Sequence, residues 1–178
     1  MKKWVEFVED CDKTILNECK NYEYLVMGLY SEIGEVAGKL KKHIRGDFPY
    51  EKLIESVKLE IGDCLWYVAM IDKYCNHSSD DVISVVYLSN VVHKSIGTSF
   101  AEIGRVFQAT ELSVPVSGGA VVPSDIYNLI SSLERVAASF DVDLVTCAEA
   151  VIEKLSKRSE IGTIKGDGDG VEDRTLNS

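Results

Sequence analysis

The chain has 178 residues, 46% of them hydrophobic, so it is long and apolar enough to bury a core of its own. Its formal net charge of −10 argues against nucleic acid or an anionic membrane as a standing partner. No uninterrupted apolar run approaches the roughly 18 residues that a membrane span needs. We expect no secretory leader, because acidic residues soon follow Lys2 and Lys3.

The cysteines indicate a reducing compartment. They are odd in number, scattered along the chain and without any CxxC pair, at Cys11, Cys19, Cys64, Cys75 and Cys147. This usage is typical of reduced thiols in a cytoplasmic protein, and not of a disulfide framework or a zinc site. We therefore expect the protein to be cytoplasmic.

Apolar residues at helical spacing predict three helices in the first half of the chain, at about residues 4–19, 22–44 and 50–74. Between the second and the third, Gly46 to Pro49 form a predicted turn. So short a connection makes these two helices antiparallel neighbours.

The second half of the chain also shows helical spacing. It predicts further helices at about 81–97, 100–112 and 124–158, the last of them broken near residues 141–143. Residues 113–123 combine Gly, Pro and β-branched residues and predict a loop. Residues 162–178 are rich in Gly, Asp and Ser and predict a flexible tail. No strand pattern competes with the helices, so the predicted fold class is all-α.

A weak internal repeat relates the two halves. Tyr24-Leu25 and the segment 31–34 find echoes in Tyr87-Leu88 and the segment 94–97. In this register Ser95 and Thr98 stand opposite Glu32 and Glu35, so the second copy has lost these acids. A degenerate tandem duplication and two hairpins that match by composition alone both remain open.

The most informative residues are two pairs of acids. Glu32 and Glu35 lie three residues apart in the second predicted helix, and Glu60 and Asp63 lie three apart in the third. Residues at this spacing share one face of a helix. Each pair lies near the middle of its helix, so antiparallel packing can bring all four carboxylates to the same level.

Four converging carboxylates repel one another and lose hydration, and a divalent cation is the natural compensation. An all-oxygen site suits Mg²⁺, or Mn²⁺ in its place, better than zinc. Bound Mg²⁺ keeps positions open for phosphate oxygens and water, which is the equipment for hydrolysing a phosphoanhydride. A solvated acidic helix face is the alternative, and composition alone does not decide between the two.

These residues resemble the MazG-like nucleotide pyrophosphohydrolases of the all-α NTP pyrophosphatase superfamily. The family signature is ExxE followed by ExxD, here Glu32-Ile33-Gly34-Glu35 and Glu60-Ile61-Gly62-Asp63. The stretches GLYSEIGEVAGKLKKHIRGD and EIGDCLWYVA also look like the family's sequence, as does the ending with KLSKR and GDGDG. The resemblance covers about residues 24–74 and 143–170.

The resemblance implies a helical bundle that hydrolyses a nucleoside triphosphate to its monophosphate and pyrophosphate. Glu32, Glu35, Glu60 and Asp63 would bind Mg²⁺ and serve catalysis, with one carboxylate acting as the base for the attacking water. It further implies a dimer or larger homo-oligomer and a set of candidate contacts to phosphate or base. These are Lys39, Lys42, Arg45, Trp66 (or its neighbour Tyr67), Lys154, Arg158 and Lys165.

On this basis residues 1–178 form a single domain, with a metal-binding half (1–78), a second half (79–161) and the tail. The chain departs from the family pattern in two places. Residues 80–140 lie where short members pass directly between two helices, and Val151 replaces a usual Asn. Alternative functions are an all-α dUTPase or a phosphoribosyl-ATP pyrophosphohydrolase. A non-catalytic helical module that senses nucleotide or metal is the alternative of another class.

Overall fold

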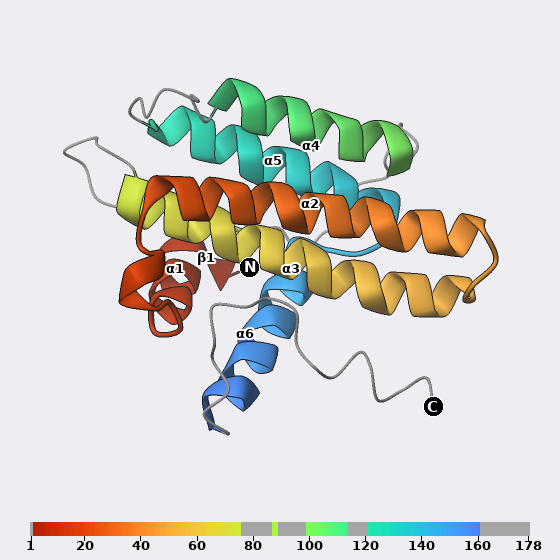
Figure 1. Ribbon diagram of the computed structural model, residues 1–178, viewed down its shortest axis with the longest axis horizontal. Helices are drawn as coiled ribbons and strands as arrows, with labels where there is room; N and C mark the ends of the chain where they lie inside the picture. The colour runs from red at the N-terminus through yellow and green to blue at the C-terminus, as the bar shows by residue number, and fades with distance from the viewer. Residues whose placement is uncertain (1, 76–86, 89–98, 114–120, 161–178) are drawn as a thin grey trace.

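The computed structural model describes residues 2–75, 87–88, 99–113 and 121–160 (Figure 1). These residues form six α-helices: α1 (Trp4–Asp12), α2 (Tyr22–Ile44), α3 (Tyr50–Cys75), α4 (Ser99–Ser113), α5 (Pro123–Ser139) and α6 (Leu144–Glu160). They also form a 3₁₀ turn (Asn17–Cys19) and two short strands, β1 (Lys2–Lys3) and β2 (Tyr87–Leu88). The predicted all-α class is confirmed.

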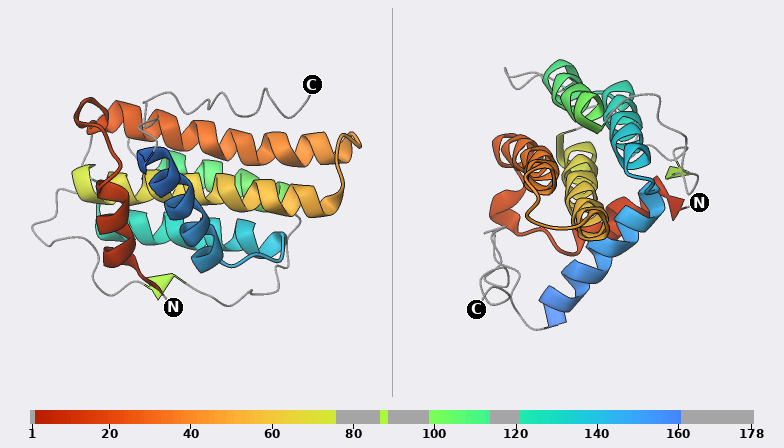
Figure 2. Two further views of the ribbon diagram at one scale, coloured as in Figure 1. Left: turned by 90° about the horizontal axis from the view of Figure 1, so that it is seen from below. Right: turned by 90° about the vertical axis from the view of Figure 1, so that its right-hand side faces the viewer.

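Two antiparallel helical hairpins lie side by side. The α2–α3 hairpin packs against α4 and α5, with α4 along α2 and α5 along α3 (Figure 1). On the other side of α3, α1 and α6 cross the hairpin and cover it (Figure 2). The result is a four-helix bundle with two extra helices on α3.

The α2–α3 hairpin begins and turns where the sequence predicts. Asn21 caps α2, because its Oδ1 accepts a hydrogen bond of 2.9 Å from the backbone N–H of Tyr24. Three basic residues fill the last turn of α2, where they interact favourably with the helix dipole. Gly46 then takes a φ of +90°, which a glycine adopts without strain, and Pro49 precedes α3.

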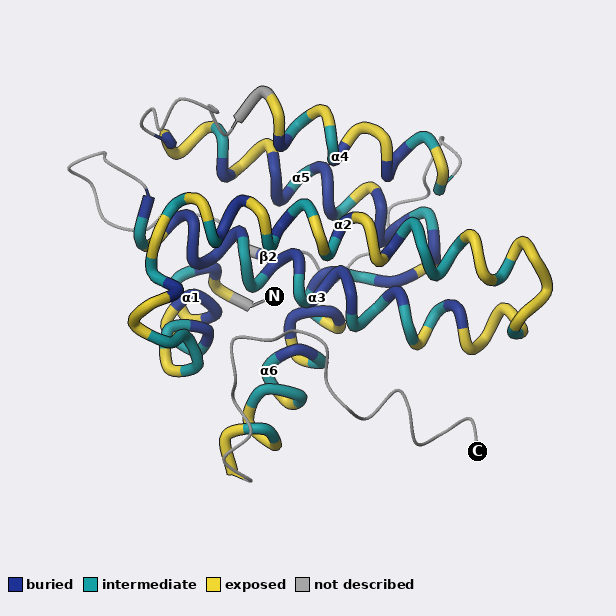
Figure 3. The backbone as a smooth tube through the Cα atoms, in the orientation of Figure 1, coloured by how far each residue is buried: buried dark blue, intermediate teal, exposed yellow. Residues whose placement is uncertain are grey.

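The core gathers around α3, which is buried on several sides (Figure 3). Its Leu53, Val57, Ile61, Leu65 and Val68 are all at most 1% exposed. A helix that contacts α1, α2, α5 and α6 must be apolar over most of its circumference. Acids on such a helix are therefore placed against neighbouring elements, and not in bulk water.

The helix α6 crosses α3 at Gly62. A Cβ on Gly62 would lie 2.6 Å from the carbonyl oxygen of Cys147 and 3.0 Å from the Cβ of Val151. Only a residue without a side chain allows this approach. The glycine in the Glu60-Ile61-Gly62-Asp63 motif thus sets how closely α6 comes to the acids.

Two predicted helices differ from the structure. The first ends at Asp12 and not near residue 19, because the hydroxyl and the N–H of Thr14 both bind the Cys11 carbonyl and Leu16 is extended. The helix predicted over 81–97 is wrong at Tyr87–Leu88, which form β2 and pair with β1. Pairing with the distant N-terminus is invisible to local periodicity. The rest of 81–97 lies outside the described residues.

The predicted break near residues 141–143 is confirmed. The helix α5 ends at Ser139, and Asp141 takes a positive φ of 58°. Asp143 then caps α6, since its Oδ1 accepts a hydrogen bond from the N–H of Thr146 (2.9 Å) and its Oδ2 one from the Thr146 hydroxyl (2.7 Å). The side-chain cap restarts the helix in a new direction.

Several predictions fall on residues outside the described part of the chain. These are most of the loop 113–123, the tail 162–178, and Ser95 and Thr98 of the repeat. The duplication stays a prediction. All five cysteines are buried thiols outside any disulfide. Among the described residues, no helix has both the length and the apolarity to cross a membrane.

Candidate functional site

Three of the four predicted acids converge between α2 and α3. Glu32 reaches in from α2, and Glu60 and Asp63 project from α3 at adjacent turns. One carboxylate oxygen of each lies within 4.8 Å of the others. Opposite ligands of an octahedral Mg²⁺ are about 4.2 Å apart, twice a bond of about 2.1 Å. Three carboxylate oxygens gathered this closely could therefore bind one divalent cation together.

The acids occupy a site of low hydration. Glu60 is 9% exposed, and Glu32 and Asp63 are half-buried. Burial, followed by the charges of Asp63, Glu35 and Glu60, raises the pKa of Glu32 to about 8. Burial also raises the pKa of Asp63, although Lys154 opposes this. Without a cation, Glu32 therefore binds a proton more readily than a solvated glutamate does.

Glu35 lies at the edge of this group. Its side chain is exposed, and its carboxylate is not among the three that lie within 4.8 Å. A step of three residues turns a helix by about 300°, so Glu35 projects about 60° away from Glu32. Its charge still contributes to the raised pKa of Glu32. The structure thus brings together Glu32, Glu60 and Asp63, with Glu35 beside them.

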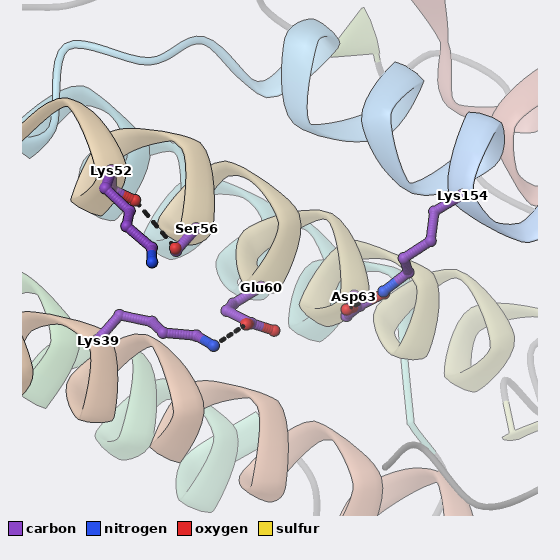
Figure 4. Close-up of polar contacts among 6 residues, drawn as sticks. All are labelled: Lys39, Lys52, Ser56, Glu60, Asp63 and Lys154. Atoms are coloured by element: carbon purple, nitrogen blue, oxygen red, sulfur yellow. Dashed lines mark hydrogen bonds and ion pairs between the residues drawn. The ribbon is translucent and has the colours of Figure 1, made fainter. Parts of the chain in front are cut away.

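Two lysines approach the acids from different helices (Figure 4). The Nζ of Lys39, on α2, lies 3.0 Å from Oε1 of Glu60. The Nζ of Lys154, on α6, donates to both oxygens of Asp63, at 2.5 Å from Oδ1. Arg158 lies one turn beyond Lys154, and its charge lowers the pKa of Asp63. Three of the predicted phosphate-binding cations therefore surround the acids.

Lys42 and Arg45 do not reach the acids. Both are exposed near the tip of the α2–α3 hairpin, where the Nε of Arg45 donates to Oδ1 of Asp47 at 2.9 Å. Thirteen residues separate Arg45 from Glu32, which is about 20 Å along the helix. The structure does not bring these two side chains to the acids, because the sequence between them and Glu32 runs along the helix axis. Their role as substrate contacts stays a prediction. Lys165 lies outside the described residues.

Trp66 faces away from the acids. Its Nε1 donates to the Thr14 hydroxyl at 2.9 Å, so the indole packs against the segment that follows α1. Its neighbour Tyr67 lies closer to the acids, since burial first, and then Tyr24, Glu32 and Asp63, raise the pKa of its phenol. Of the two aromatic candidates, the structure places Tyr67 at the site.

The packing of Tyr67 against Gly28 was not predicted from the sequence. A Cβ on Gly28 would lie 2.1 Å from Cε1 of Tyr67, so the phenol ring rests directly on the backbone of α2. The ring centroids of Tyr24 and Tyr67 lie 6.3 Å apart. A glycine within a helix costs roughly 1 kcal/mol relative to alanine. A glycine inside a predicted helix, in spite of this cost, was the signal in the sequence that Gly28 allows close packing.

The donor set suits a hard cation. It consists of carboxylates alone, and the nearest cysteine, Cys64, has its pKa raised by burial and by the neighbouring acids, which disfavours a thiolate ligand. With lysines and an arginine at the rim, the site can hold a divalent cation on one side and anionic oxygens on the other.

Comparison with known proteins yields little. No protein family matches the chain, and no solved structure matches it. A stretch of 65 residues, 35% of the chain, is 37% identical to the Gene 37 protein of Mycobacterium phage L5. The chain spans about half the length of this curated relative (52%), whose name states no activity.

Proposed function

We propose that this protein is a Mg²⁺-dependent nucleoside triphosphate pyrophosphohydrolase. The reaction is (d)NTP and water to (d)NMP and pyrophosphate. The observation that supports it best is the convergence of Glu32, Glu60 and Asp63 within 4.8 Å, beside two partly buried lysines. A hydrolase for a polyanionic substrate needs this combination, because its acids hold the metal and its cations hold the phosphates.

The metal ligands of the proposed site are Glu32, Glu60 and Asp63, with Glu35 beside them for a further ligand or a second ion. Bound Mg²⁺, or Mn²⁺ in its place, would neutralise phosphate charge and orient the attacking water. Water attacks the α-phosphorus, the bond to the bridging oxygen breaks, and pyrophosphate leaves. One of the carboxylates accepts the proton of the water.

The other residues hold the substrate in line for attack. Lys39, Lys154 and Arg158 bind phosphate oxygens, and Tyr67 forms a wall against the base or the sugar. Position and charge supply most of the rate in phosphoryl transfer. Val151 is fully buried against Gly62, so this position contributes packing where the family has a polar residue. Substrate selectivity must then come from other side chains, such as Tyr67.

The proposal includes a cytoplasmic location and assembly as a homodimer or larger homo-oligomer. Five buried thiols outside any disulfide suit a reducing compartment. Exposed Met27 (61%), in the second turn of α2, and Ile44 (75%), at its last residue, leave apolar surface for contact with a second copy. Sedimentation of the purified protein tests the assembly.

A second candidate is a non-catalytic module that senses nucleotide or metal. The observation in its favour is that Lys39 and Lys154 pair with Glu60 and Asp63, so two of the acids already have cationic partners within the chain. Such a module would bind the same ligands and release no product.

The deciding experiment is a search for product. Pyrophosphate and monophosphate are measured with Mg²⁺ and with Mn²⁺ on the eight common NTPs and dNTPs, on dUTP and on phosphoribosyl-ATP. We expect stoichiometric release of both products from at least one substrate. Preference for dUTP or for phosphoribosyl-ATP identifies one of the related hydrolases. Nucleotide binding without any product identifies the sensing module.

A further inference from the structure

The contact between Lys154 and Asp63 links the second half of α6 to α3. Lys154 belongs to α6, which crosses α3 and extends away from the bundle (Figure 1). Its ammonium group donates to both oxygens of Asp63, the residue that ends the motif on α3 (Figure 4). Asp63 is thus occupied by a cation that the chain itself provides.

We propose that Lys154 is a built-in counter-cation which competes with the divalent metal for Asp63, so that metal binding releases the C-terminal half of α6. This inference rests on the proposed metal site. It adds an order of events: the metal binds first and displaces Lys154, which then becomes available to phosphate.

The two halves of α6 are held differently. The buried residues of its first half are Leu144, Cys147, Ala148 and Val151, and they pack where Gly62 permits the closest approach. Residues 152–160 are half-buried or exposed, and Ile152 and Leu155 pack only partly against the core. The ion pair of Lys154 is a direct polar contact between this second half and α3.

Competition follows from the geometry at Asp63. A divalent cation bound with Glu32 and Glu60 needs one oxygen of Asp63, and Lys154 contacts both. A metal ion and an ammonium group on one carboxylate would repel each other at short range. Lys39 differs, because it lies on the same hairpin as the acids and reaches Glu60 through Oε1. Its displacement would move no other helix.

Release of Lys154 would also free a binding group. Arg158 lies one turn further along the same face of α6, so the two cations move together. Once the metal holds the acids, both can turn to the phosphates of an incoming triphosphate and fold α6 back over it. Metal alone would therefore loosen α6, and metal with nucleotide would order it again.

The test is Mn²⁺ binding without nucleotide, measured from the electron paramagnetic resonance signal of free Mn²⁺. It compares wild type, Lys154→Met and the control Lys157→Met, whose lysine is exposed on α6 and pairs with Glu153. Lys154→Met should bind Mn²⁺ about tenfold more tightly than wild type, since no ammonium group competes. Lys157→Met should bind like wild type. Hydrogen exchange over residues 152–160 should speed up in wild type when Mn²⁺ is added.

The outcomes separate this inference from the function that it rests on. If all three proteins bind Mn²⁺ equally, or Lys154→Met binds it more weakly while keeping its helical circular dichroism, Lys154 is not a competitor and the metal site stands. Unchanged exchange over residues 152–160 in Mn²⁺-bound wild type overturns the release of α6. If neither wild type nor Lys154→Met binds Mn²⁺ at millimolar concentration, the metal site fails and the inference fails with it.

Discussion

The two hairpins of the bundle share an architecture and differ in their buried charges. The α2–α3 hairpin brings three carboxylates together and balances them with lysines from α2 and α6. In the α4–α5 hairpin, Glu102 is 3% exposed and pairs with Arg105 on α4 and Arg135 on α5, whose Nε lies 3.4 Å from Oε2. One acid between two guanidinium groups has no need of a metal. A helical hairpin becomes a candidate metal site through its excess of buried carboxylates, and not through its shape.

The largest expected effect comes from removing that excess. Asp63→Asn and Glu60→Gln keep the shape of each side chain and remove one charge, which makes α2–α3 resemble α4–α5. We expect each variant to lose pyrophosphate release by at least about 100-fold, the scale for loss of a major electrostatic group. The control is Glu55→Gln, an exposed acid of α3 that pairs with Lys58. Full activity in both test variants would remove the acids from the mechanism.

The close crossing of α6 over α3 gives the next effect. Gly62→Ala places a Cβ 2.6 Å from the Cys147 carbonyl oxygen, and overpacking of this kind costs about 1–3 kcal/mol of unfolding free energy. The control is Gly34→Ala on α2, where a Cβ meets nothing within 4 Å and alanine favours the helix by about 1 kcal/mol. Urea unfolding should show shifts of opposite sign. Equal shifts would mean that α3 and α6 are not in close contact at Gly62.

A variant of the α4–α5 hairpin tests whether its buried acid takes part in the reaction. Glu102→Gln removes the charge that the two arginines share, and should cost about 1–2 kcal/mol of unfolding free energy. Pyrophosphate release should stay within about twofold of wild type, because this acid stabilises the α4–α5 hairpin and is not one of the proposed metal ligands. The pair of readouts distinguishes the hairpins: a large loss of activity here would place the second half in the reaction.

The last expected effect is a pH dependence of stability. Because the pKa of Glu32 rises from 4.5 to about 8 on folding, the folded state binds the extra proton. Its contribution to stability is full below pH 4.5 and is lost as pH rises through about 8. We expect the unfolding free energy of metal-free wild type to fall relative to that of Glu32→Gln as the pH rises from 5 to 8.5. Identical pH profiles of chemical unfolding for the two proteins would contradict the raised pKa.

Local patterns predicted the first hairpin closely. The periodicity of α2 and α3 and the Gly46 turn depend on neighbours within a few residues, and the predicted helix bounds agree with the structure to within one residue. The convergence of Glu32 with Glu60 and Asp63 follows from helical spacing and a short turn. The same reasoning failed at Tyr87–Leu88, because the partner of that strand lies at the other end of the chain.

Short-range periodicity therefore sufficed to predict the fold class, the pairing of α2 with α3 and the grouping of Glu32 with Glu60 and Asp63. Which other groups meet these acids depended on the tertiary structure. In the tertiary structure, Lys154 of α6 contacts Asp63, and Trp66 donates to Thr14. Tyr67 lies near the acids, and Arg45 lies at the tip of the hairpin. These outcomes depend on how α1 and α6 cross α3. That crossing is set by close packing at positions such as Gly62, and no local pattern encodes it.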